Sequence, residues 1–158
     1  MIHAKLFSGA ENSGKLVARV KNEARHYATE NNYKYVLIDG APGIGCPVIS
    51  SLAGADFVLI VTEPTIPGFH DLKRVYELVR KFNIPAGCII NKYDLNTDLS
   101  KQIENYLASE EIPLISTLPY DESFTRAMIQ GQTIIEYNQN SLSEIINQSW
   151  NKVKQLIN

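Results

Sequence analysis

The sequence predicts an α/β fold in which helices cover both faces of a mostly parallel β-sheet. Short apolar runs rich in β-branched residues alternate along the chain with longer stretches of helical periodicity, an order typical of parallel sheets. The runs are almost continuously apolar, as expected of strands buried on both faces. Strands are predicted at Tyr35–Asp39, Phe57–Thr62, Gly87–Asn91 and Leu114–Thr117, with a weaker one at Ile2–Phe7.

Amphipathic helices are predicted between and after these strands. Apolar residues recur at helical spacing from Leu16 to Ala28, from Leu72 to Phe82 and from Leu99 to Leu107. The last helix is predicted to begin at the capping box Ser141–Glu144, which precedes an apolar stripe that includes Trp150. Because no repeat or linker interrupts this pattern, residues 1–158 are expected to form a single domain.

Composition limits the kinds of partner and compartment. Of the 158 residues, 44% are apolar and 20% are charged, with a formal net charge of −2, which is the balance of a globular domain. No basic stripe predicts nucleic-acid binding, and no apolar run is long enough to span a membrane. The only two cysteines, Cys46 and Cys88, have no C-x-x-C partner, and no signal peptide is recognisable. We therefore expect reduced thiols and a cytoplasmic location.

Polar segments rich in glycine and proline follow each predicted strand. In an open parallel sheet, ligands bind beyond the carboxyl ends of the strands. These segments should therefore gather along one edge of the sheet and carry its chemistry. They are Asp39–Gly43, Thr62–Thr65, Asn91–Asp94 and Leu118–Asp121.

Asp39 ends the first of these strands and is the candidate metal carboxylate. In phosphoryl-transfer sites such a carboxylate orients the water shell of a Mg²⁺ ion beside the β- and γ-phosphates. Gly40, Gly43 and Gly45 then allow a close approach of backbone N–H groups to a terminal phosphate. The alternative is a turn started by Asp39, with Cys46 and Pro47 opening the next helix.

Asn91-Lys92-Tyr93-Asp94 matches the pattern N-K-x-D directly after a predicted strand. An Asn amide and an Asp carboxylate together can read the edge of a purine, and the Lys stem can lie along the base plane. The alternative is a turn leading to a helix capped by Thr97. Pro119, Tyr120 and Asp121 could close the other side of the base pocket, or Asp121 could simply cap the following helix.

The segment Gly9–Lys15 fits G-x-x-x-x-G-K, the pattern of a phosphate-binding loop. Leu16 occupies the position where a Ser or Thr hydroxyl must reach the Mg²⁺ ion, and leucine cannot ligate a metal. The alternative is a turn that caps the next helix at Asn12 or Ser13.

Six ordered blocks of the chain together resemble the MinD/ParA/Mrp group of P-loop ATPases. The similarity is greatest to the MinD-like branch that usually carries a ferredoxin-type iron–sulfur insert. It runs from about Ala4 to Gln132. The matching blocks are Glu11–Val17, Tyr35–Val48, Val61–Thr65, Gly68–Arg74, Ile90–Asn96 and Leu118–Asp121.

The resemblance implies a role for each candidate residue. Asp39 would be the Walker B carboxylate that holds Mg²⁺ through water, and the segment from Gly40 to Gly45, with Gly43 at its centre, would sense the γ-phosphate. The protein would bind ATP or ADP by its base, which is usually adenine in this group. GTP stays an alternative, because N-K-x-D is typical of proteins that bind guanine. A first-switch role would fall to Ser13, Gly14 and Lys15, and a base-binding role to Asn91, Lys92, Asp94, Pro119, Tyr120 and Asp121.

Two parts of the family pattern are absent from this sequence. The lysine-rich phosphate loop and its preceding strand are not found, and two cysteines cannot ligate a four-iron cluster, so no iron–sulfur cluster is expected. The fold expected is thus an incomplete P-loop NTPase fold of the SIMIBI type. In such folds the absent strand lies between those predicted at Tyr35–Asp39 and Phe57–Thr62, so these two must pair directly or leave a slot. Met1 could begin an expressed fragment, a wrongly assigned gene start or a decayed paralogue.

The leading hypothesis is an ATP-binding switch domain that needs Mg²⁺ and is inactive alone, with weak nucleotide binding and negligible hydrolysis. A homodimer or a missing N-terminal segment would complete it. Two alternatives stay open: a non-catalytic interaction module on the same fold, and a GTP-specific switch. No nucleic-acid or membrane partner is expected.

Overall fold

The computed structural model describes residues 1–4, 13–137 and 141–157 of the chain. These residues form two compact units, Met1–Ala55 and Asp56–Asn158. Each unit has its own internal packing and is described by itself below. The expectation of a single domain over residues 1–158 stays a prediction.

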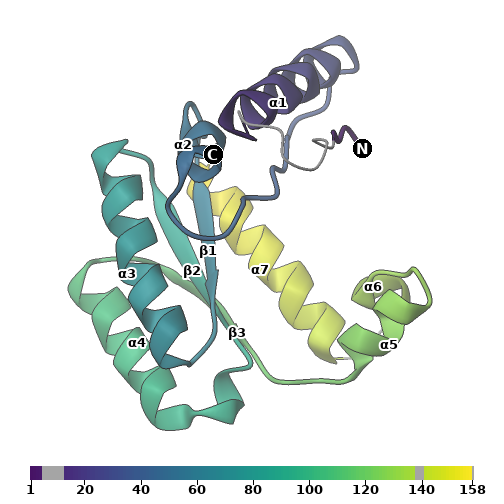
Figure 1. Cartoon of the computed structure of the whole chain (residues 1–158). Helices are drawn as coiled ribbons and strands as arrows, with labels where there is room; N and C mark the ends of the chain where they lie inside the picture. Colours follow the sequence, from purple (N-terminus) through teal and green to yellow (C-terminus); the bar gives the residue numbers. More distant parts are fainter. Residues whose placement is uncertain (5–12, 138–140, 158) are drawn as a thin grey trace. The chain divides into compact units, whose positions relative to one another are not determined.

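The Asp56–Asn158 unit is built on a three-stranded parallel sheet in the order β1-β2-β3 (Figure 1). The strands are β1 (Val58–Thr62), β2 (Ala86–Asn91) and β3 (Leu114–Leu118). Each lies within a residue of its predicted bounds. Three predicted strands and their parallel pairing are therefore confirmed.

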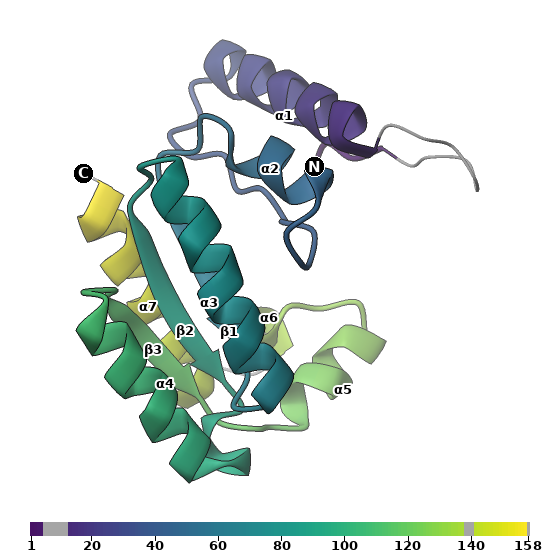
Figure 2. The same cartoon turned by 60° about the vertical axis from the view of Figure 1, so that its left-hand side comes forward.

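Helices cover both faces of this sheet, as the apolar runs predicted. Figures 1 and 2 show α3 (Ile66–Lys81) and α4 (Thr97–Ser109) on one face and α7 (Ser141–Ile157) on the other. The first face has a core of fully buried side chains that includes Leu72, Cys88, Ile90 and Ile103. The second has a smaller core of Ile89, Ile115 and Val153. Burial raises the pKa of the Cys88 thiol to about 12, so this cysteine stays protonated and serves as a small core residue.

Short elements connect the layers of this unit. They are the 3₁₀ turn η1 (Tyr93–Leu95) and the helices α5 (Ser123–Ile129) and α6 (Ile134–Tyr137). The predicted cap of α4 at Thr97 is wrong by one residue. Asn96 is the N-cap, because its side-chain oxygen accepts a hydrogen bond of 3.0 Å from the Leu99 amide.

The described residues of the Met1–Ala55 unit include two helices and the irregular segment between them. The helices are α1 (Ser13–Glu30), which confirms the predicted periodicity, and α2 (Cys46–Leu52), which begins at Cys46-Pro47 as predicted. The two pack closely at Gly14, where a Cβ atom would lie 3.0 Å from Ser50 Oγ and 3.4 Å from Cys46 Cβ.

The strand predicted at Tyr35–Asp39 is wrong. Residues 35–39 form no β-ladder with any described residue, and Leu37 is 88% exposed. A strand exists only when a neighbour supplies hydrogen-bond partners. The apolar pattern alone does not show whether a neighbouring strand is present. The weaker strand predicted at Ile2–Phe7 is not formed over residues 2–4, and residues 5–7 lie outside the described residues.

Strand β1 leaves apolar surface exposed at the side of the sheet. It is the outermost strand of the described sheet, since only β2 pairs with it. Ile60 and Thr62 are buried, whereas the alternating residues Leu59 and Val61 are 37% and 59% exposed. This strand therefore carries a half-covered face. Within the described ranges, no helix combines the length and apolarity needed to cross a lipid bilayer.

Candidate functional site

The carboxyl ends of the three strands lie at one edge of the sheet because the strands are parallel. Thr62 is level with Ile90 on β2, and Asn91 is level with Leu118 on β3. The segments that follow these residues are the ones predicted to carry chemistry. The structure thus brings three of the four predicted segments together at one edge.

Glu63, which follows β1, contacts two residues of the N-K-x-D segment. Its Oε1 atom lies 2.7 Å from Lys92 Nζ in an ion pair and accepts a hydrogen bond of 3.4 Å from Asn91 Nδ2. Both members of the ion pair are partly exposed, with side-chain exposures of 36% for Lys92 and 41% for Glu63. The end of β1 is therefore tied to the end of β2 by side chains.

Asp94 ties the end of β2 to the segment after β3. Its Oδ1 atom accepts a hydrogen bond of 2.7 Å from the Tyr120 amide. Nearby, Ser100 Oγ donates a hydrogen bond of 2.7 Å to the Tyr93 carbonyl oxygen and so fixes the turn that carries Asp94. Pro119 and Tyr120 thus lie beside Asp94, and the base-binding role of these residues stays a prediction.

Asp121 contacts the start of α5. Its Oδ1 atom accepts hydrogen bonds from both the amide and the hydroxyl of Ser123, the first residue of α5. These two hydrogen bonds lower the pKa of Asp121 because they stabilise the ionised carboxylate. The N-cap position of α5 is Glu122, one residue after the predicted Asp121. The role of Asp121 toward a nucleotide stays a prediction.

Asp39 and Gly43 belong to the other unit. Asp39 is exposed at the end of an irregular segment, and Gly43 has a φ of +85°, a left-handed conformation that favours glycine. The loop ends at Gly45, whose carbonyl oxygen accepts from the Val48 and Ile49 amides in the first turn of α2. The gathering of Asp39 and Gly43 with Asn91 and Asp94 at a common hollow stays a prediction.

Asp39 could bind Mg²⁺ only through water and together with a nucleotide, as the family resemblance implies. Among the described residues, no group of three or more His, Cys, Asp or Glu side chains could hold a metal. Mg²⁺ is commonly bound by one or two carboxylates together with waters and substrate phosphates. A single exposed carboxylate is therefore compatible with an ion that arrives with its nucleotide.

The segment Ser13–Lys15 forms the first turn of α1, and Gly9 to Asn12 lie outside the described residues. Gly14 packs against α2, as described above, and Lys15 is exposed. The close approach of the two helices is a structural reason for the glycine. The predicted first-switch role is untested.

Two basic residues of α1 that the motifs did not single out hold the end of α2. Lys21 is only 5% exposed, and its Nζ donates hydrogen bonds to the carbonyl oxygens of Ser50 and, at 2.6 Å, Ala53. Arg25 donates to the Gly54 carbonyl oxygen. Burial and the neighbouring Arg25 lower the pKa of Lys21. A lysine on the apolar face of the helix, seven residues after Gly14, was the signal in the sequence.

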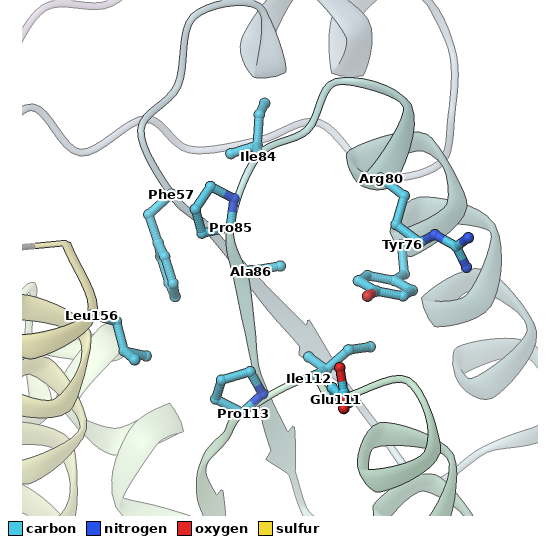
Figure 3. A pocket seen from close by; sticks show the side chains of 10 residues that line it. All are labelled: Phe57, Tyr76, Arg80, Ile84, Pro85, Ala86, Glu111, Ile112, Pro113 and Leu156. Carbon is cyan, nitrogen blue, oxygen red and sulfur yellow. The ribbon is translucent and has the colours of Figure 1, made fainter.

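A shallow pocket of about 290 Å³ lies at the opposite edge of the sheet from Asn91 (Figure 3). Most of its lining is apolar or aromatic, and it comes from the segments that precede β1, β2 and β3 and from α3 and α7. Arg80 at its rim pairs with Glu110 at 3.1 Å. The lining residues are Phe57, Tyr76, Arg80, Ile84, Pro85, Ala86, Glu111, Ile112, Pro113 and Leu156. This pocket is therefore not the predicted nucleotide site.

Solved structures share this fold. The cell division ATPase MinD of Pyrococcus furiosus superposes with a TM-score of 0.73 at 20% identity, covering 92% of this chain and 59% of that one. The septum site-determining protein MinD of Pyrococcus horikoshii, solved in complex with Mg-ADP, gives a TM-score of 0.71 at 18% identity, with 92% and 58% covered. The fold is therefore that of the MinD/ParA P-loop ATPases, as the resemblance predicted.

Sequence comparisons agree with this class. The chain is 33% identical over 145 residues to an uncharacterised protein of Methanocaldococcus jannaschii, covering 90% of this chain and 49% of that protein. It is 23% identical over 137 residues to a protein described as a septum site-determining MinD in Nephroselmis olivacea, covering 76% and 50%. No protein-family model matches. The chain spans about half the length of these relatives.

Proposed function

We propose that this chain is the base-binding part of an ATP-dependent switch protein. The observation that supports the proposal most is the joined edge of the sheet, where Glu63 contacts Asn91 and Lys92, and Asp94 contacts Tyr120. The fold supports it as well, since a MinD with the same fold was solved with Mg-ADP.

In this proposal the N-K-x-D segment recognises the purine. Asn91 offers an amide donor and acceptor, Asp94 offers carboxylate oxygens, and the stem of Lys92 lies along the face of the base. Pro119 and Tyr120, which are next to Asp94, would contact the other side of the base. ATP is the expected ligand, and GTP is the alternative that the experiment below distinguishes.

For the phosphate end of a nucleotide, the proposal relies on the family resemblance, which gives this role to Asp39 and Gly43. Asp39 would orient the water shell of Mg²⁺, which neutralises phosphate charge when bound. The backbone amides around Gly43 would respond to the terminal phosphate. Since no lysine-rich phosphate loop is found in the sequence, we expect no measurable hydrolysis by this chain alone. Turnover abolished by Lys15→Ala would instead assign the phosphate loop to Gly9–Lys15.

Titration calorimetry and thermal shifts with Mg-ATP, Mg-ADP and Mg-GTP test the proposal. We expect weak but saturable binding of the adenine nucleotides, with stabilisation that grows with ligand concentration by mass action. Asp94→Asn should weaken binding, because the carboxylate facing Tyr120 is lost. Asp98→Asn, an exposed carboxylate at the start of α4, is the matched control and should bind like the wild type.

Two other outcomes would reject the proposal in favour of an alternative. No heat and no thermal shift with any nucleotide would favour the non-catalytic interaction module. A preference for GTP that disappears in Asp94→Asn would favour the GTP-specific switch.

We also propose that the outer edge of β1 receives a further strand, from a second copy or from a segment outside this chain. Leu59 and Val61 leave the middle of this strand apolar and exposed, and such an edge favours association. The relatives, about twice as long as this chain, contain additional sequence that could supply a strand.

Analytical ultracentrifugation tests whether the chain associates through the outer edge of β1. We expect concentration-dependent association of the wild type and a 17.7 kDa monomer for Val61→Lys, because a charged side chain on an edge strand opposes pairing. Ile66→Lys, which replaces an 81% exposed apolar residue of α3, is the control and should associate like the wild type. A wild type that stays monomeric at all concentrations would contradict pairing with a second copy. Equal association of Val61→Lys and Ile66→Lys would show that the outer edge of β1 is not the site of association.

A further inference from the structure

Glu63 has no role in the motifs that define the proposed site, yet it contacts two of the residues that would hold the base. We infer that Glu63 is a positioning and specificity residue: its carboxylate fixes Lys92 and Asn91 in the arrangement that an adenine base requires. The inference rests on the proposed function. It adds that Glu63, which follows β1, controls the base specificity of Asn91 and Lys92 at the end of β2.

The backbone that carries Glu63 is held in place by the first turn of α3. Thr62, which is buried, donates a hydrogen bond of 3.0 Å from Oγ1 to the Gly68 carbonyl oxygen. Thr65 caps the helix by accepting a hydrogen bond of 3.0 Å from the Gly68 amide. The Glu63 carbonyl oxygen itself accepts from the Thr65 amide at 2.8 Å. The carboxylate therefore extends from a fixed point toward the end of β2.

Lys92 is held in an uncommon conformation. Its φ and ψ are 54° and 40°, the left-handed region, which residues with a side chain rarely adopt. Such a conformation persists where the surroundings determine it. The ion pair of 2.7 Å with Glu63 is one such constraint, since it holds the end of the Lys92 side chain. Because the backbone and the Nζ atom of Lys92 are both held, its aliphatic stem has a fixed position against which a base can pack.

The contact with Glu63 also orients the Asn91 amide. An ionised carboxylate can only accept hydrogen bonds. The Nδ2 group of Asn91 must therefore face Glu63, as it does at 3.4 Å, and its Oδ1 atom faces the other way. A carbonyl oxygen in that position accepts from the exocyclic amine of adenine. The corresponding group of guanine is a carbonyl oxygen, which cannot donate.

Titration of ¹⁵N-labelled full-length chain with adenosine and with guanosine tests this inference without involving the phosphate site. In the wild type we expect adenosine to bind more tightly than guanosine. Glu63→Gln should weaken adenosine binding by about two- to fivefold, the range expected for a partly exposed ion pair. Its amide can donate to Asn91 Oδ1, so the preference for adenosine over guanosine should also shrink. Glu104→Gln, an exposed carboxylate on α4, is the matched control.

A double-mutant cycle links the effect to the contact. Lys92→Met keeps an apolar stem and removes the charge, and adding it to Glu63→Gln should weaken adenosine binding no further than the larger single change. Wild-type affinity and base preference in Glu63→Gln, or fully additive losses in the double variant, would overturn the inference while leaving the proposed function intact. A wild type that binds neither nucleoside would overturn both.

Discussion

Replacing Gly68 by alanine is expected to destabilise the Asp56–Asn158 unit by about 1–3 kcal/mol, the usual cost of forcing extra atoms into a packed site. A Cβ atom at this position would lie 2.6 Å from the Glu63 carbonyl oxygen and 2.9 Å from Thr65 Oγ1. The first contact is with backbone, which cannot rotate away. The turn between β1 and α3 would have to shift, and with it the carboxylate of Glu63.

Urea unfolding of the Gly68→Ala variant measures this effect. The same substitution normally stabilises a helix, since alanine has a higher helix propensity than glycine by about 1 kcal/mol, so a loss of stability cannot come from propensity. His70→Ala, an exposed position on the same helix, is the control and should stay within about 0.5 kcal/mol of the wild type. A Gly68→Ala variant as stable as the wild type would show that the turn is looser than described.

Replacing Lys21 by methionine is expected to destabilise α2 by about 2–3 kcal/mol, because two hydrogen bonds from a buried, charged donor to backbone carbonyl groups are lost. The last carbonyl groups of a helix have no partners within it, and α2, at seven residues, is too short to be stable alone. Lys21 supplies those partners from α1 by donating to the carbonyl oxygens of Ser50 and Ala53.

Hydrogen exchange of the α2 amides measures the Lys21 effect locally. In Lys21→Met the amides of Cys46–Leu52 should exchange faster by about 30- to 150-fold, which corresponds to the lost free energy. Arg19→Met removes an exposed positive charge from the same helix and should leave the exchange unchanged. Equal exchange in both variants would mean that Lys21 does not hold this helix. The loop that carries Gly43 ends where α2 begins, so this helix also sets one boundary of the proposed phosphate sensor.

The three strands of the sheet could be predicted from the sequence because the residues of each strand and its flanking turns indicate it. β1, β2 and β3 were predicted within a residue, because each is a buried apolar run bounded by turn residues. Residues 35–39 have the same pattern and form no strand, since a strand also requires a neighbour and apolarity does not specify one. The pattern therefore identified segments able to form strands, and pairing decided which of them did.

The candidate site was predictable to a similar extent. The N-K-x-D segment and Tyr120 come together as the order of strands and turns predicted. Glu63 and Lys21 were missed because their partners, Lys92 and Ser50, lie 29 residues away in each case. The position of Lys21 on the apolar face of its helix indicates that it is buried, but does not identify its partners. Asp121 shows the opposite limit, since its local pattern fitted both a base contact and a helix cap, and its contacts are local ones with Ser123 at the start of α5.

The central claim is that a purine nucleotide binds at the carboxyl edge of the sheet. The most direct test is a map of amide chemical-shift changes on titration of the labelled chain with Mg-ATP. We predict saturable shifts at Asn91, Lys92, Asp94 and Tyr120, with Phe57 and Ala86 at the opposite edge unchanged. Shifts confined to that opposite edge, or no saturable shift at any residue, would contradict the account.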